Sequence, residues 1–271
     1  MRRKLGQHFL TDRRIIQRML ATAQLTPQDR VVEIGPGNGS LTFSLARQAK
    51  QLIALEYDAE LTRHLQHAFA GQAHVRILHA DARAINYAEL LADGEAQPVR
   101  VKIVANLPYY AAVPILFTIF HYAYVFGEGI LMFQKEVAER ITAAPGSKRY
   151  GALSVAAQYY SQPEYCFSIA AEAFRPRPKV ESAVIKLSFL PQPQIDVLDR
   201  ADFFQLVKYA FRSRRKTLKN SLTKNCAARF PLPLLNRAFE YLHFPENIRG
   251  EELSLADFAH LSNCLLQMQR S

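Results

Sequence analysis

The sequence is poor in cysteine: its 271 residues include three, Cys166, Cys226 and Cys264. They are far apart and form no Cys-x-x-Cys pair, so they cannot provide the disulfide framework of a small secreted domain. The eight histidines show neither a His-Glu-x-x-His motif nor a His/Cys spacing typical of zinc sites. We therefore expect a reducing, cytoplasmic location and no metal.

Long apolar runs are also scarce. The first residues, MRRKLGQHFLTDRRIIQRM, contain basic side chains but no sustained apolar core of the kind that a signal peptide has. Residues 109–127 carry no charged side chain and are long enough for a spanning helix. However, Pro114, Thr118 and His121 interrupt this segment, and tyrosines are spread along it. We expect a buried helix and a loop there, and no membrane span.

Basic residues are in excess. Lys and Arg number 34 and Asp and Glu 24, which gives a formal net charge of +10. Such a balance favours a polyanionic partner, most often nucleic acid, although a merely solvated basic surface stays open. Hydrophobic residues make up 49% of the chain, enough for one large domain with or without a small appendage.

Short strand-like runs alternate with helical patterns along the first half of the chain. The predicted strands cover residues 30–35, 51–57, 75–81, 101–106 and 129–134. The predicted helices cover residues 40–49, 59–70, 113–121 and 135–143. This alternation is typical of parallel β-α-β units and predicts an α/β fold with an open, Rossmann-like sheet.

The pattern changes after Tyr150. A helical stretch at 151–160 precedes two strands, 164–169 and 182–190, which we expect to form an antiparallel pair that closes the sheet. The prolines of PQPQ (191–194) indicate a linker. Helical segments follow at 201–211, 213–223, 232–242 and 254–268. We therefore predict a larger α/β domain over residues 1–194 and a small all-helical domain over residues 195–271.

A glycine-rich turn follows the first predicted strand. Gly35, Gly37 and Gly39 can let the backbone turn sharply and approach a ligand. The fingerprint of NAD-binding sheets would place its third glycine at position 40, which is Ser40. A nucleotide site and a plain tight turn therefore both stay open at this point.

Polar residues end the following strands. Glu56 can accept both hydroxyls of a ribose, and Asp81 can accept from the exocyclic amine of an adenine. Asn106 ends the next strand, and the carboxyl ends of parallel strands meet at one edge of a sheet. Each acid alone could be a helix N-cap, but together they predict a nucleotide pocket. Glu33, inside the first strand, could serve the turn, the cofactor amino group or the surrounding structure.

Several motifs now resemble a known family. They are GQHFL (6–10), EIGPGNGSLT (33–42), ALEYD (54–58), ADA (80–82), NLPYY (106–110), FRPRPKVESAV (174–184) and RRKTLKN (214–220). The chain resembles the class I S-adenosylmethionine (SAM)-dependent methyltransferases. More narrowly, it is similar to the rRNA adenine N6,N6-dimethyltransferases of the KsgA/RsmA branch, and the similarity spans almost the whole chain. That branch dimethylates two adjacent adenosines near the 3′ end of small-subunit (16S) rRNA.

The resemblance implies a site for each reactant. Cofactor contacts would come from His8, Leu10, Gly35, Gly37, Glu56, Asp81, Ala82 and Asn106; position 8 is often Asn in this motif. The catalytic group would be Asn106, Leu107, Pro108, Tyr109 and Phe174. The Asn106 amide oxygen and the Leu107 carbonyl would hold the adenine amine, and Pro108 would stiffen the loop. Tyr109 and Phe174 would stack on the extruded base, the alternatives being a turn or core tyrosine and a core phenylalanine.

Two basic clusters complete the prediction. RNA contacts are expected from Arg175, Arg177, Lys179, Arg212, Arg214, Arg215, Lys216 and Lys219, the last five on a short helix. The expected partner is small-subunit rRNA in an immature 30S-type particle, and we expect a monomer. Rival interpretations are a large-subunit rRNA methyltransferase of the erythromycin-resistance type, an NAD-dependent oxidoreductase, and a non-catalytic RNA-binding assembly factor.

Overall fold

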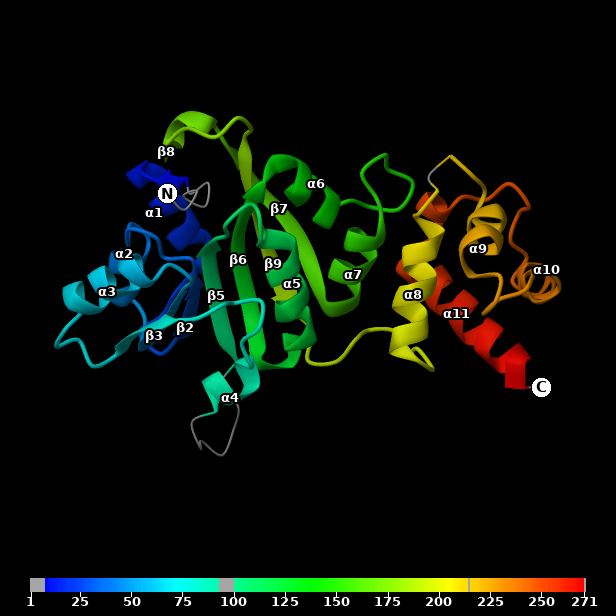
Figure 1. The fold of residues 1–271 in the computed structure, drawn as a ribbon, viewed down its shortest axis with the longest axis horizontal. Coiled ribbons are helices and arrows are strands. Elements are labelled where there is room, and N and C mark those ends of the chain that lie inside the picture. The colour runs from blue at the N-terminus through cyan, green and yellow to red at the C-terminus, as the bar shows by residue number, and fades with distance from the viewer. Residues whose placement is uncertain (1–7, 93–99, 214, 271) are drawn as a thin grey trace. The chain divides into compact units, whose positions relative to one another are not determined.

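The computed structural model describes residues 8–92, 100–213 and 215–270. The chain divides into two compact units. The sheet unit contains Met1–Ala138 and Ser161–Pro191, and the helical unit contains Glu139–Tyr160 and Gln192–Ser271. Figure 1 labels their elements along the chain.

The sheet unit is built on a seven-stranded sheet with the order β4-β3-β2-β5-β6-β9-β7. The strands are β2 (Arg30–Ile34), β3 (Gln51–Glu56), β4 (Val75–His79), β5 (Val101–Asn106), β6 (Phe126–Gln134), β7 (Ser161–Ile169) and β9 (Ser182–Phe189). The five strands from β4 to β6 are parallel, and β9 lies antiparallel between β6 and β7. The predicted α/β class, with an antiparallel pair closing a parallel sheet, is confirmed.

Helices accompany this sheet (Figure 1). They are α1 (Arg13–Ala23), α2 (Thr42–Ala46), α3 (Ala59–Ala68), α4 (Tyr87–Leu91) and α5 (Ala112–His121), while α6 (Lys135–Ile141) crosses the boundary between the units. Helix α5 occupies the charge-free segment and buries Ile115, Leu116, Ile119 and Phe120. Among the described residues, no helix is long and apolar enough to cross a membrane.

Two elements near the N-terminus were not predicted. Helix α1 begins after Asp12, whose side chain accepts a hydrogen bond from the Arg14 backbone N–H. Its buried residues, Ile16, Met19, Leu20 and Ala23, follow helical spacing, so this signal was present in the sequence. Strand β1 (Phe9–Leu10) pairs antiparallel with β8 (Phe174–Arg175), a contact between distant parts of the chain.

The core of the sheet unit lies between these helices and the sheet. Met19 of α1, Leu45 of α2, Leu52 of β3, Val104 of β5 and Met132 of β6 are all fully buried in one cluster. Each fully buried aliphatic side chain stabilises the fold by roughly 1.5–3 kcal/mol relative to exposure. A well-packed core of this kind holds the strand ends, and thus the loops that follow them, in fixed positions.

The helical unit contains α7 (Ala152–Tyr160), α8 (Arg200–Ala210), α9 (Leu218–Cys226), α10 (Leu232–Tyr241) and α11 (Leu255–Arg270). Three short 3₁₀ helices, Ala123–Val125, Ala171–Ala173 and Gly250–Glu252, complete the described elements of the two units. The core of the helical unit joins Tyr159 of α7 to Phe203, Leu206 and Phe258.

The division of the chain differs from the predicted boundary in residues 139–160. These residues group with the C-terminal helices because Tyr159 stacks on Phe203, with ring centroids 5.4 Å apart. The helix predicted over 213–223 also begins later than expected. Thr217 caps α9 by accepting from the Asn220 N–H, so the described residues just before Thr217 lie in a turn.

Candidate active site

A pocket opens at the carboxyl edge of the parallel strands of the sheet unit. All the residues predicted to contact the cofactor line it: His8, Leu10, Gly35, Gly37, Glu56, Asp81, Ala82 and Asn106. They come from the N-terminal segment and from the ends of β2, β3, β4 and β5. Leu107, Pro108 and Tyr109 line the same pocket, so the structure brings both predicted groups together.

The turn after β2 has a backbone conformation that favours glycine. Gly35, Gly37 and Gly39 have φ angles of +69°, +59° and +85°. A Cβ at Gly37 would lie 2.9 Å from the Phe9 ring, so β1 covers this turn closely. Sequence reasoning missed Phe9, whose position depends on the pairing of β1 with β8.

Glu56 is held in place by two backbone N–H groups. Gly37 N donates to Oε2 at 3.0 Å and Asp58 N donates to Oε1 at 2.9 Å, and the residue is 5% exposed. Because each carboxylate oxygen can accept about two hydrogen bonds, each retains one acceptor position. Two fixed acceptors side by side suit the two hydroxyls of a ribose.

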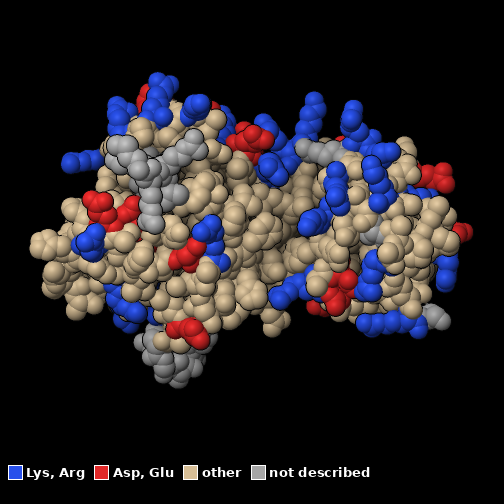
Figure 2. Space-filling model, in the orientation of Figure 1, with Lys and Arg blue, Asp and Glu red and all other residues tan. Residues whose placement is uncertain are grey.

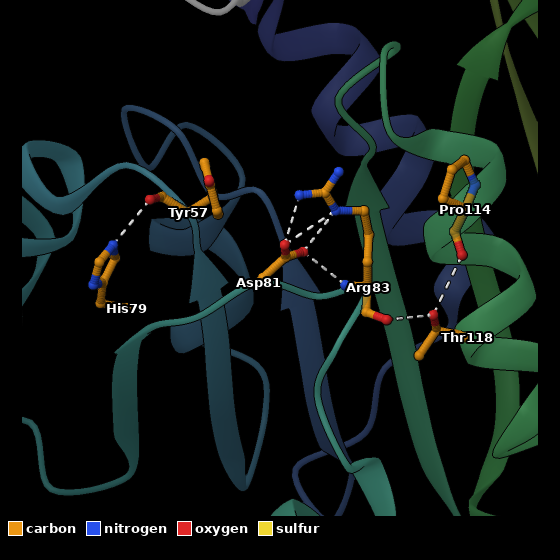
Figure 3. Close-up of polar contacts among 6 residues, drawn as sticks. All are labelled: Tyr57, His79, Asp81, Arg83, Pro114 and Thr118. Carbon is orange, nitrogen blue, oxygen red and sulfur yellow. Dashed lines mark hydrogen bonds and ion pairs between the residues drawn. The ribbon is translucent and has the colours of Figure 1, made fainter.

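Asp81 differs from Glu56 because its acceptor positions are already used (Figure 3). Oδ1 accepts from the backbone N and the Nε of Arg83, both at 2.9 Å. Oδ2 accepts from Arg83 Nε at 3.1 Å and from Nη2 at 2.6 Å. These contacts lower the pKa of the Asp81 carboxyl below its usual value. Sequence reasoning missed Arg83, although it follows the predicted Asp81-Ala82 pair directly and lines the pocket.

Glu33 lies in the pocket wall and is 1% exposed. Burial raises the pKa of its carboxyl to about 8, the Thr42 hydroxyl opposes this rise, and the negative charge of Glu56 adds to it. Among the described residues, Glu33 Oε2 has no hydrogen-bond partner. A buried carboxyl of this kind at a pocket wall suits a cationic ligand group, because a nearby positive charge favours its ionised form.

Asn106 lines the pocket and keeps one side-chain acceptor available. Its Nδ2 donates to the His8 carbonyl at 3.4 Å, and among the described residues this is the one hydrogen bond of the side chain. The amide oxygen is therefore unused. The following turn is fixed because Leu107 N donates to Met132 O at 3.3 Å and Ala111 N donates to Pro108 O at 2.9 Å.

Tyr109 is half-buried at the pocket, and a hydrogen bond holds its hydroxyl. Its hydroxyl forms a short hydrogen bond with the Ser182 hydroxyl of β9, which is fully buried. Burial raises the pKa of the Tyr109 phenol, and the Ser182 hydrogen bond opposes that rise. On the other side, its ring centroid is 5.6 Å from that of His8, with the planes inclined by 32°.

Phe174 does not lie where a ring that stacks on the target base would be expected. It does not line the pocket, and its side chain is packed in the core, with 0% of the residue accessible to solvent. It pairs with Leu10 across the β1–β8 ribbon, while His8 Nδ1 donates to the Pro176 carbonyl at 2.7 Å. The placement does not support a stacking role for Phe174, because a ring buried in the core has no face open to a base. It indicates instead that Phe174 anchors the segment that carries His8.

The predicted RNA-binding residues fall on both units. In the sheet unit, Arg175, Arg177 and Lys179 are exposed, and Arg177 forms an ion pair with Glu172. In the helical unit, Arg212, Arg215 and Lys216 are exposed in the turn before α9, so the expectation that they lie on a helix is wrong.

Two residues of the second basic cluster differ from the others. Lys219 lies in α9, is partly buried and has its Nζ 5.3 Å from the Phe239 ring centroid. Arg214 lies outside the described residues. Figure 2 shows lysine and arginine side chains spread over the visible face of each unit, with smaller acidic groups between them.

The chain is similar to known proteins over most of its length. The model of the family described as ribosomal RNA adenine dimethylase matches residues 1–238. The ribosomal RNA small subunit methyltransferase A of Halothermothrix orenii is 39% identical over 261 residues, which cover 96% of this chain and 87% of the relative. The protein of the same name from Alkaliphilus metalliredigens is 40% identical over 262 residues, or 96% and 90% of the two chains.

Two solved structures share the fold. A dimethyladenosine transferase from Plasmodium falciparum gives a TM-score of 0.79 at 24% identity and covers 97% of this chain and 98% of its own. The 23S rRNA methyltransferase ErmE gives a TM-score of 0.69 at 23% identity and covers 96% and 100%. At these identities the two structures support the fold alone.

Proposed function

Since the chain belongs to the ribosomal RNA adenine dimethylase family, we propose that it dimethylates N6 of two adjacent adenosines near the 3′ end of small-subunit (16S) rRNA during ribosome biogenesis. By family, it is a SAM-dependent methyltransferase. The observation that carries the proposal is the meeting of Asn106, Leu107 and Tyr109 with the glycine turn at one pocket. The choice of the small subunit follows the names of the relatives that match nearly the whole chain.

The pocket fits the cofactor by three features. Gly35 and Gly37 line the pocket with the positive φ angles of a sharp turn, Glu56 offers two spare acceptors for the ribose, and Glu33 has an unused carboxyl oxygen. Asp81 and Ala82 would hold the adenine end, and His8 and Leu10 would cover the cofactor from the N-terminal segment. When bound, SAM supplies an electrophilic methyl group on a positively charged sulfur.

The target amine would be held by two acceptors. The lone pair of an adenine N6 amine is delocalised into the ring, so the nitrogen must pyramidalise before it can attack. The Asn106 amide oxygen and the Leu107 carbonyl would accept its two N–H groups and stabilise the positive charge that develops on nitrogen. After transfer, the N6 proton leaves to solvent, and no strong base is required before that step. Tyr109 would hold the purine by stacking, so much of the rate enhancement is positional.

The basic residues of both units would bind the RNA backbone. Arg175, Arg177 and Lys179 flank the segment that holds His8, and the turn before α9 carries Arg212, Arg215 and Lys216. Phosphate contacts of this kind position a nucleic acid without reading its sequence. The partner would be an immature 30S-type particle, met by a monomer in the cytoplasm.

A direct experiment separates this function from its rivals. The protein is incubated with methyl-labelled SAM and either small or large ribosomal subunits that lack adenine methylation, and the modified bases are mapped. We expect two adjacent dimethylated adenosines in the small subunit. Label in the large subunit alone would indicate the erythromycin-resistance type of activity. Tight binding of small subunits with no transferred label would indicate a non-catalytic assembly factor.

A further inference from the structure

A second concave surface lies beside the pocket of the candidate active site. It has a volume of about 520 Å³, within the roughly 300–1,000 Å³ typical of ligand sites. We call it the α1–α2 groove, because its walls come from the start of α1 and from α2. Its polar and aromatic lining consists of Arg13, Gln17, Ser40, Phe43, Ser44 and Arg47, next to Thr11. Ser40 lines both the groove and the cofactor pocket, so the two concavities adjoin.

The groove is positively charged. Among the described residues, its lining includes two arginines, Arg13 and Arg47, and no Asp or Glu. Both are exposed, and neither forms an ion pair with any carboxylate of the described residues. The nearest acid in sequence, Asp12, is already paired with Arg14 at 3.0 Å. Two guanidinium groups without a competing acid suit a phosphodiester, because their forked donors match phosphate oxygens.

The Ser44 hydroxyl and the Gln17 amide add donors to the lining of the groove. Arg47 Nη2 donates to Ser44 Oγ at 3.3 Å, which restrains the guanidinium and leaves the hydroxyl proton of Ser44 for another acceptor. Ser40 is fixed because its hydroxyl and its backbone N–H both donate to Asn38 Oδ1, at 2.7 Å and 3.2 Å. The exposed Gln17 amide completes this polar lining.

An exposed aromatic ring lies in the same groove. Phe43 is 41% exposed, although one face stacks on the buried Phe69, with centroids 4.9 Å apart and planes inclined by 29°. The ring also lies close to the glycine turn, 3.0 Å from where a Cβ at Gly39 would stand. A ring supported on one side and open on the other is the usual platform for a nucleic-acid base.

We propose that the α1–α2 groove binds a nucleotide of the RNA strand next to the target adenosine, with Arg13 and Arg47 on its phosphates and Phe43 against its base. This inference rests on the proposed function. The target base can enter the pocket of the candidate active site only if its neighbours in the strand lie close to the rim of that pocket. Ser40 lines both this pocket and the basic, aromatic groove, so the groove adjoins the rim. The groove holds the strand and reads little sequence, since stacking and phosphate binding accept any base.

The test compares two double variants of equal charge. Arg13→Ala/Arg47→Ala removes the groove cations, and Arg63→Ala/Arg76→Ala removes two exposed arginines of the same unit that line neither concavity. Affinity is measured for a naked 3′ fragment of 16S rRNA and for unmethylated small subunits, both with S-adenosylhomocysteine bound. We expect affinity to fall about tenfold or more for both RNAs in the groove variant alone. For the groove variant, the slope of log affinity against log salt concentration should also be shallower by about 0.7 for each phosphate that the variant no longer neutralises.

Further measurements keep the possible failures apart. S-adenosylhomocysteine should bind all variants equally; weaker binding confined to the groove variant would make the groove part of the cofactor site and overturn the proposal. Reduced affinity for whole subunits with unchanged affinity for the naked fragment would indicate a ribosomal protein as the occupant and would also overturn it. Phe43→Tyr should bind RNA like the wild type because it keeps the aromatic ring, and Phe43→Leu should bind RNA more weakly. Both side chains keep a packing surface for Phe69, so the comparison tests the ring alone. RNA affinity is measured without turnover. Failure of the protein to transfer methyl groups would therefore refute the proposed function, while the affinity of the groove variant would still decide whether the groove binds RNA.

Discussion

Arg83 uses all the acceptor positions of the Asp81 carboxylate, through its backbone N–H and its guanidinium, at distances from 2.6 to 3.1 Å (Figure 3). The backbone of Arg83 is fixed as well, because Thr118 Oγ1 donates to its carbonyl at 2.9 Å. If Asp81 accepts from the adenine amine of the cofactor, the guanidinium must leave at least one oxygen first. The pair is part-exposed, at 42% for Arg83 and 31% for Asp81, so this exchange costs little free energy.

Replacing Arg83 should therefore strengthen cofactor binding. With Arg83→Met, we expect S-adenosylhomocysteine to bind about two- to fivefold more tightly by calorimetry, the range that an exposed ion pair of up to about 1 kcal/mol allows. An analogue with inosine in place of adenosine lacks the amine and should show no gain. Arg63→Met, an exposed arginine outside the pocket, is the charge control. Weaker binding in Arg83→Met would mean that Arg83 itself contacts the cofactor.

Asn106 should be essential for transfer and dispensable for the fold. Asn106→Ala removes the acceptor for the target amine, and losing one such group typically lowers kcat by about 10²–10³. The measurement is single-turnover methyl transfer to unmethylated small subunits, with the melting temperature as the check on folding. Asn236→Ala, at an exposed position of α10 outside the pocket, is the matched control and should retain most activity. A folded Asn106→Ala protein of normal activity would refute the mechanism.

Tyr109 should act through its ring, with the hydroxyl serving as a tether. Tyr109→Phe and Ser182→Ala each remove the same hydrogen bond, so both should lower activity modestly, and the double variant should be no worse than either. Tyr109→Ala also removes the stacking surface, and we expect activity to fall by a further 10- to 100-fold, roughly. Equal activity of the Phe and Ala variants would contradict stacking.

The sequence was sufficient to predict the cofactor residues because they depend on local signals. Glu56, Asp81 and Asn106 each end or closely follow a parallel strand, and such ends meet at one edge whatever the rest of the chain does. The periodicity of strands and helices is therefore enough to place the three side chains together.

The remaining features depend on contacts between distant residues. Phe174 is buried because β8 pairs with β1, more than 160 residues away, and no local pattern distinguishes that ring from an exposed one. Residues 139–160 group with the helical unit because Tyr159 packs on Phe203. The engagement of Asp81 depends on a side-chain conformation of Arg83, which periodicity does not specify.

Phe174 gives the clearest test of core packing against base stacking. Phe174→Leu keeps an apolar side chain, so we expect a folded protein whose kcat and KM for small subunits stay near those of the wild type. Phe174→Ala leaves a cavity, and we expect the free energy of unfolding, measured by urea denaturation, to fall by about 3–5 kcal/mol. Normal stability combined with a large loss of activity in the Leu variant would restore the stacking role.

Glu33 should make stability depend on pH in a direction unusual for a carboxylate. Its pKa in the fold is about 8, above the ordinary value of 4.5, so the folded state holds this proton more tightly than the unfolded state. Its contribution to stability is complete below about pH 4.5 and is lost as the pH rises toward 8, at about 1.4 kcal/mol for each pKa unit.

Glu33→Gln has no such proton to lose. We expect the unfolding free energy of this variant to exceed that of the wild type increasingly from about pH 5 to about pH 8, measured by urea denaturation without cofactor. Groups far from Glu33 titrate alike in the two proteins, so the difference isolates Glu33 together with its coupling to Glu56. Parallel curves over this range would mean that the carboxyl ionises at its ordinary pKa and that burial does not hold its proton.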